Sequence, residues 1–149
     1  MSNGFGLPRY RLKRNSAKSS LEILNWSINP ELKKSAEEHY RTRFAASLKD
    51  KEPLEIIRQI TFDGVAPDIG IKNIENLFNF VERRFLKKRI KGIGLEVGAG
   101  PATFSSVLAK RDAVRKMYAV EVCSPIVDFL APKVTDYVLT GRADKVVGA

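Results

Sequence analysis

One stretch near the middle of the chain decides the fold: Leu95-Glu96-Val97-Gly98-Ala99-Gly100-Pro101-Ala102. The short apolar segment from Ile93 to Val97 predicts a buried parallel strand. The glycine turn after it leads into a helix predicted from Ala102 to Arg111. Gly98 permits the backbone angles of a sharp turn. Gly100 lets a ligand approach the backbone closely, beside the free N–H groups of the helix N-terminus.

The segments that follow continue the alternation of strand and helix. A second apolar strand is predicted from Met117 to Val122, and Ser124-Pro125 opens a helix that runs to about Leu139. A third strand is predicted from Lys145 to Ala149. This βαβαβ order predicts an α/β fold, a partial Rossmann-like doubly wound parallel sheet of which the chain supplies the first three strands.

An acidic residue stands where such a fold needs one to bind a nucleoside. Glu121 ends the second strand, 21 residues after Gly100, so we expect it beside the glycine turn. A carboxylate there accepts hydrogen bonds from the two vicinal hydroxyls of a ribose. The spacing therefore predicts a nucleoside ligand.

Three residues bear on which nucleoside this is. The dinucleotide fingerprint asks for Gly or Ala where this chain has Thr103, and Pro101 removes one N–H from the turn. Glu96 would repel a pyrophosphate and favour a cation. These features favour a positively charged nucleoside without phosphate. An NAD(P)-binding oxidoreductase fragment stays open as an alternative.

The stretch from Glu96 to Ala102, with Glu121 after the next strand, resembles motif I and the ribose-binding acid of class I S-adenosylmethionine-dependent methyltransferases, of the methyltransferase type 11-like kind. Ala102 stands where the usual motif has its third glycine. The resemblance covers about residues 92–149. It implies that S-adenosyl-L-methionine is the cofactor and that the enzyme methylates an acceptor, most simply a small molecule, which the sequence does not identify.

The resemblance also implies which residues hold this cofactor. Glu96 would contact the methionine amino group, and Gly98 and Gly100 would line the methionine part, with Ala99 and Ala102 completing the turn. Glu121 would hold the ribose, and the residues next to it, Val122 and Cys123, would lie near the adenosine. Apart from the resemblance, Cys123 is interpreted as a small core residue.

The family's sheet has seven strands, and this chain accounts for three. We therefore expect the N-terminal piece of a longer methyltransferase that is inactive alone and binds S-adenosylmethionine weakly or not at all. Without a fourth strand, the strand at Ile93 to Val97 is expected to be an open edge, which favours aggregation or pairing with another chain.

The part before residue 92 is basic. Residues 1–91 hold 19 Lys and Arg against 11 Asp and Glu, whereas residues 92–149 hold 7 against 6. We expect a flexible basic tail over 1–20 and a helical N-terminal region over 21–69, with helices at 30–48 and 54–62 and a linker at 66–70. The clearest helix, at 70–91, is the expected lead-in to the cofactor-binding half at 70–149.

The cations at the end of that lead-in helix are interpreted as a solvated face that complements the helix dipole. A nucleic-acid contact stays open there, as does contact of residues 1–20 with nucleic acid or an anionic membrane. A non-catalytic basic binding module is therefore a further alternative function.

Several classes of protein are disfavoured. No apolar run is long enough for a transmembrane segment, and the N-terminus lacks a secretory signal, so we expect a cytoplasmic protein. The single Cys excludes an internal disulfide. We predict no metal site, and the one His, His39, is interpreted as structural, so the catalytic residues stay unknown.

Overall fold

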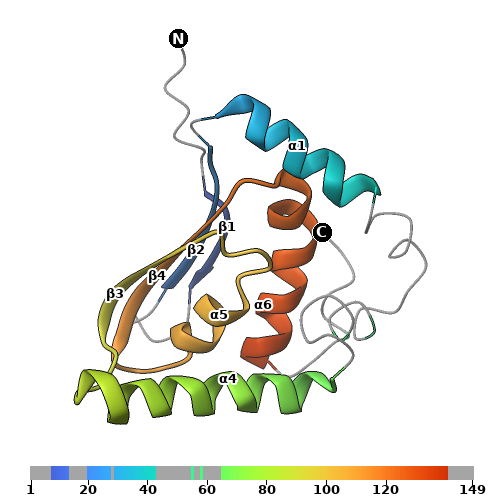
Figure 1. Ribbon diagram of the computed structural model, residues 1–149. Helices are drawn as coiled ribbons and strands as arrows, with labels where there is room; N and C mark the ends of the chain where they lie inside the picture. Colours follow the sequence, from blue (N-terminus) through green and yellow to red (C-terminus); the bar gives the residue numbers. More distant parts are fainter. Residues whose placement is uncertain are drawn as a thin grey trace.

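The computed structural model describes residues 8–13, 20–27, 29–42, 55, 58 and 65–140 of the chain. These residues form a four-stranded sheet in the order β1-β2-β4-β3 (Figure 1). The strands are β1 (Pro8–Lys13), β2 (Ser20–Asn25), β3 (Gly92–Val97) and β4 (Val114–Glu121). β2, β4 and β3 are mutually parallel, and β1 pairs antiparallel with β2. The chain is therefore an α/β protein built on a parallel core.

The helices form layers on one side of this sheet. They are α1 (Pro30–Tyr40), α4 (Pro67–Val81), the π-helical turn η2 (Glu82–Leu86), α5 (Thr103–Ala109), the π-helical turn η3 (Ile126–Leu130) and α6 (Ala131–Thr140). α5 and α6 cover the sheet, and α4 packs against them and runs below both, across the end of the molecule where β3 begins (Figure 1). α1 crosses the edge at which the parallel strands end.

The prediction of a flexible tail to residue 20 followed by a wholly helical region is wrong at two places, because residues 8–13 and 20–25 are strands. In β2, Leu21 and Ile23 are fully buried on the face that packs against the helices. This two-residue alternation is short and lies among polar residues. Its pairing partner, β4, is about ninety residues away, so local pattern alone does not reveal it.

β2 lies next to β4 on the side away from β3. In a βαβαβ unit, that neighbour position belongs to the third strand of the chain. The strand predicted at 145–149 lies outside the described residues. The two strands predicted at the glycine turn and before Glu121 are confirmed, with β4 beginning three residues earlier than expected.

The helix predicted at 70–91 is confirmed with different bounds. α4 begins at Pro67, within the predicted linker, because proline is well suited to the first helical position. The helix ends with η2 at Leu86, where Lys87 takes a left-handed conformation, so the cations from Lys87 onward lie beyond it. The helix predicted at 30–48 is confirmed as far as Tyr40. Of the one predicted at 54–62, only Glu55 and Arg58 are described.

One face of the sheet has no cover among the described residues. On β3, Ile93, Leu95 and Val97 point to that face and are 63%, 65% and 75% exposed. β3 is also the edge strand of the described sheet, as expected. Parallel sheets normally bury both faces, so an uncovered apolar face on an edge strand is a site for further packing.

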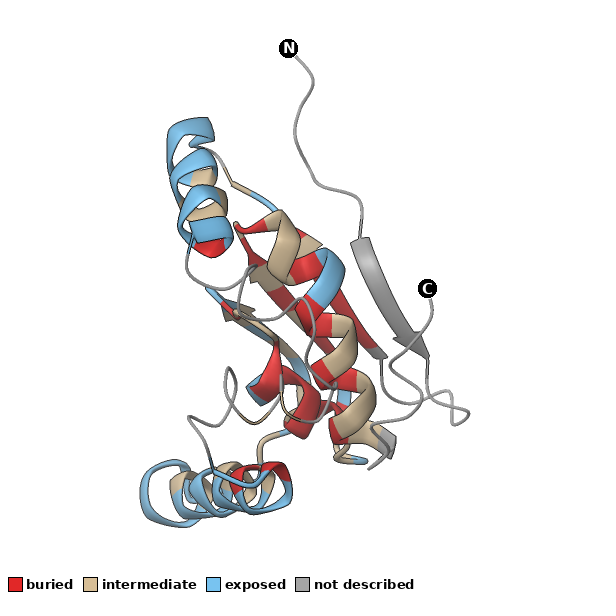
Figure 2. Cartoon of the chain, turned by 90° about the vertical axis from the view of Figure 1, so that its right-hand side faces the viewer, coloured by how far each residue is buried: buried red, intermediate tan, exposed pale blue. Residues whose placement is uncertain are grey.

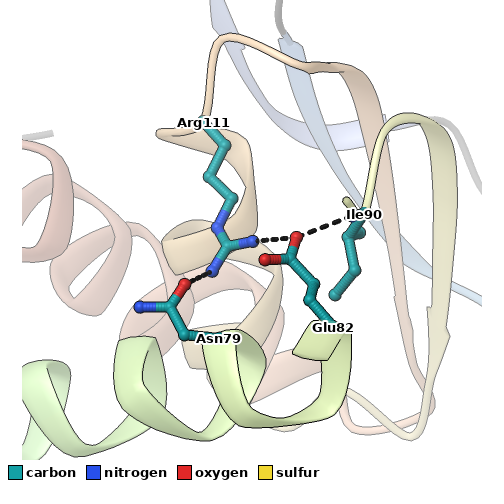
Figure 3. Close-up of polar contacts among 4 residues, drawn as sticks. All are labelled: Asn79, Glu82, Ile90 and Arg111. Atoms are coloured by element: carbon teal, nitrogen blue, oxygen red, sulfur yellow. Dashed lines mark hydrogen bonds and ion pairs between the residues drawn. The ribbon is translucent and has the colours of Figure 1, made fainter. Parts of the chain in front are cut away.

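A cluster of polar side chains connects η2, which follows α4, to the segments that precede β3 and β4 (Figure 3). One oxygen of Glu82 accepts hydrogen bonds from Ile90 N and from Arg111 Nη1, each at 2.6 Å. Arg111 also donates to Asn79 at 3.0 Å and lies over the ring of Phe78. The Glu82 side chain is only 13% exposed, so these contacts neutralise a largely buried carboxylate.

Replacing the cation of this cluster should therefore destabilise the fold. Arg111→Met is expected to lower the free energy of unfolding by about 2 kcal/mol, because Glu82 loses its charged partner. Urea unfolding followed by circular dichroism measures the change. The control Arg115→Met removes an exposed cation from β4 and should cost less than about 0.5 kcal/mol. Equal unfolding midpoints for the two variants would contradict this role.

Candidate functional site

The glycine turn between β3 and α5 is held by backbone hydrogen bonds to the neighbouring strand. Gly98 N and Ala99 N both donate to Val120 O, at 2.8 and 3.0 Å. Gly98 and Gly100 have φ of +69° and +53°, a region that glycine enters without a steric cost. Gly98 therefore has the conformational role that the sequence predicts. Gly100, predicted only to let a ligand approach the backbone, has a positive φ as well.

Ala102, which stands where the methyltransferase motif has its third glycine, is also left-handed, with φ of +60°. Alanine pays a steric cost there that glycine does not. Its side chain is fully buried in the core beside Ala99, which offsets part of that cost. Sequence reasoning treats Ala102 as the start of the helix, whereas the helix begins one residue later, at Thr103.

Glu121 lies beside the glycine turn, as predicted from its spacing. Its carboxylate accepts one hydrogen bond at each oxygen, from Gly100 N at 2.8 Å and from Cys123 N at 2.9 Å. The residue is buried, with 8% of its surface exposed. Because a carboxylate has about four acceptor positions, both oxygens can still accept from a ligand hydroxyl.

Glu96 reaches from the end of β3 to the first turn of α5. Its Oε2 accepts from both the backbone N (3.0 Å) and the hydroxyl of Ser105. Ala102, the residue at the N-cap position, makes no side-chain cap, so Glu96 provides the cap from another element. Within the described part of the chain Oε1 has no partner, and this half-buried atom is free to accept from a ligand.

Two further observations concern the space beside the turn and a polar side chain next to it. A Cβ placed on Gly98 or on Gly100 would meet no atom within 4 Å, so the space beside both residues is open. Next to them, the Thr103 hydroxyl is buried, and no hydrogen-bond partner for it is found among the described residues. A buried hydroxyl without a partner is costly, and a ligand or a bound water would satisfy it.

The N-terminal segment closes over the same edge of the sheet. Asn25, at the end of β2, donates to the carbonyls of Glu121 and Val122, at 3.1 and 3.0 Å. The side-chain Oδ1 of Asn25 accepts from Lys33 Nζ and from Ser124 Oγ, both at 2.8 Å. Val122 is thus placed at the carboxyl edge, half-buried beside Glu121. Local sequence does not single out Asn25, because its contacts with Glu121, Val122 and Ser124 span 96 to 99 residues.

Cys123 is buried below α1, with its sulfur 3.8 Å from Ala36 O. Burial is the main cause that raises the pKa of its thiol. Burial likewise raises the pKa of the nearby Tyr40 hydroxyl. The thiol is therefore protonated at neutral pH, and Cys123 is the packed core residue that its type predicts.

None of the described helices combines the length and apolar character that crossing a bilayer requires. Among the described residues, no cluster of His, Cys, Asp and Glu is arranged to hold a metal ion. In comparisons of the chain with protein-family models, with curated proteins and with solved structures, no match was found.

The capping role of Glu96 can be measured. Glu96→Ala removes the acceptor for Ser105 N and should lower the free energy of unfolding by about 1 kcal/mol, as loss of a helix cap does. Urea unfolding gives the value. Glu38→Ala removes an exposed carboxylate from α1 and should change stability by less than about 0.5 kcal/mol. A loss no larger than the control's would show that Glu96 does not cap α5.

The burial of Cys123 predicts slow chemical modification. Iodoacetamide should alkylate the folded chain much more slowly at pH 7 than the urea-unfolded chain, because the thiol is both covered and protonated. Mass spectrometry follows the reaction without ambiguity, since Cys123 is the single Cys. The folded rate should rise as the pH is raised above the usual thiol range. Equal rates in the two states at pH 7 would contradict the placement of α1 over this residue.

Proposed function

We propose that this chain carries the cofactor-binding half of an S-adenosylmethionine-dependent methyltransferase. The observation that carries the proposal is the 2.8 Å hydrogen bond between Gly100 N and the Glu121 carboxylate. This bond joins the glycine turn, beside which the ligand would lie, to the acid proposed to hold the ribose. Both stand at the carboxyl edge of the parallel strands. In open α/β sheets, nucleoside ligands bind at this edge.

The charge and hydrogen bonding of the turn support a cationic ligand over a dinucleotide. Gly98, Ala99 and Gly100 each donate their N–H group within the chain, and Ala102 N donates to Ala99 O. Pro101 has no N–H, so this turn offers few free donors to a pyrophosphate. The carboxylates of Glu96 and Glu121 flank the same space and would repel phosphates. The NAD(P) alternative is therefore the less favoured one.

The residues at the glycine turn and the carboxyl edge match the parts of S-adenosylmethionine. Glu121 would accept from the ribose hydroxyls, and the free Oε1 of Glu96 would accept from the methionine ammonium group. The open space beside Gly98 and Gly100 would admit the methionine chain. Ala99 and Ala102 shape the turn from within the core, and Val122 follows Glu121 at the edge where the adenosine would lie.

When bound, S-adenosylmethionine supplies a sulfonium methyl group that an acceptor nucleophile attacks in line, with the sulfur leaving as a neutral thioether. The chain's own contribution would be to bind, orient and shield this group rather than to exchange protons. The acceptor is proposed to be a small molecule. We assign no catalytic residue within this chain, and further strands beside β3 would complete both the sheet and the acceptor side.

Ligand-observed NMR tests the proposal, because saturation-transfer signals report even weak binding. We expect signals from the adenosine protons of S-adenosylmethionine, displaced by S-adenosylhomocysteine and not by NADH. Glu121→Gln should remove them, because the amide places a donor against one of the two backbone N–H groups and weakens the ribose contact. The matched control Asp68→Asn, an exposed acid-to-amide change on α4, should leave them unchanged.

Two results would count against the proposal. Equal signals from Glu121→Gln and the unaltered chain would remove Glu121 from the site. Preferential binding of NADH would favour the oxidoreductase alternative. Micromolar affinity by calorimetry would support the cofactor but contradict the expectation that this chain alone binds it weakly.

A further inference from the structure

The outward face of α4 and η2 carries a stripe of large apolar side chains. Leu77, Phe80, Phe85 and Leu86 are between 43% and 69% exposed. The opposite side of α4 packs on α5 and α6 through Ile71, Ile74 and Phe78. Figure 2 shows most of α4 exposed, with its contact side turned to the body of the molecule.

The π-helical turn extends this stripe. In a regular α-helix, residues five apart point in different directions, whereas i→i+5 bonding stacks them. Phe85 accordingly lies against Phe80, with ring centroids 5.7 Å apart and an interplanar angle of 79°. The irregular turn η2 thus keeps a second aromatic side chain on the outer face instead of returning it to the core.

A dense group of cations adjoins this stripe. Residues 83–91 contain Arg83, Arg84, Lys87, Lys88, Arg89 and Lys91 and no acid, and all six side chains are exposed. The acid that precedes them, Glu82, is paired with Arg111, and Glu75 is paired with Lys110. We call these six cations and the four apolar residues of the stripe the basic–apolar surface.

We propose that the basic–apolar surface docks on an anionic phospholipid bilayer. Phe80 and Phe85 would enter the headgroup region while the surrounding cations meet the phosphates, the arrangement of an interfacial amphipathic helix. A nucleic acid fits less well. Leu77 and Leu86 cannot stack on bases, residues 83–91 hold no uncharged polar side chain, and the edge-to-face ring pair leaves less free ring surface.

Vesicle co-flotation of the whole chain tests this surface. Binding is expected to vesicles of phosphatidylcholine with phosphatidylserine and not to phosphatidylcholine alone. Arg84→Gln with Lys88→Gln should weaken binding roughly thirtyfold, since each interfacial cation contributes about 1 kcal/mol. The matched control, Lys34→Gln on α1 with Arg41→Gln at its C-cap, changes the net charge equally and should weaken binding much less.

Separate variants test the apolar side chains of the basic–apolar surface. Phe85→Ser should abolish most binding, whereas Leu32→Ser, which removes an exposed apolar side chain from α1, should not. Since the chain has one Trp, Phe85→Trp in a Trp26→Phe background should be quenched by brominated lipid. Vesicle binding that is indifferent to Phe85→Ser, no vesicle binding, or tighter binding of single-stranded RNA through the same cations would overturn the proposal.

Discussion

The arrangement of the site depends on the Glu121 carboxylate. By accepting from Gly100 N and Cys123 N, it ties the turn after β3 to the turn after β4. Both turns would otherwise expose backbone donors at the carboxyl edge, where no further strand residue can pair with them. Because one oxygen serves each turn, the carboxylate is fixed in position before any ligand arrives. A ribose would meet acceptors that are already oriented, which reduces the ordering cost of binding.

The two carboxylate oxygens of Glu96 also have different environments. Oε2 is committed to Ser105 and stabilises α5, and Oε1 faces no partner among the described residues. Glu96 is the penultimate residue of β3, beside the glycine turn. Together with Glu121 it gives the turn a negative character, although helix N-termini usually attract anions. This reversal is the physical reason for preferring a cationic nucleoside over a dinucleotide.

Sequence alone predicted the parts of the fold whose signals are local. The strand–turn–helix at Glu96 to Ala102 and the position of Glu121 follow from glycine conformations and from a fixed spacing, and both are confirmed. The strands β1 and β2 were missed, because their stability comes from pairing with β4 far along the chain. Asn25 at the carboxyl edge and Ser105 under Glu96 were missed for a related reason. A polar residue acquires such a role only when tertiary structure brings distant groups together.

The two ends of the parallel strands have opposite character. At the carboxyl edge, the buried Glu121, the half-buried Glu96 and the closed turns form a small acidic site under α1. The start of β3, at the other end, directly follows the cations from Lys87 to Lys91, which lie beyond η2. This separation explains how one chain can carry a strong net positive charge and still present an acidic site at the carboxyl edge. The Glu82–Arg111 contact holds α4 against the loop before β4, so the outer helix keeps a fixed orientation relative to the sheet. A bilayer bound at α4 would therefore leave the carboxyl edge free, so the proposed docking surface and the proposed cofactor site do not compete for the same residues.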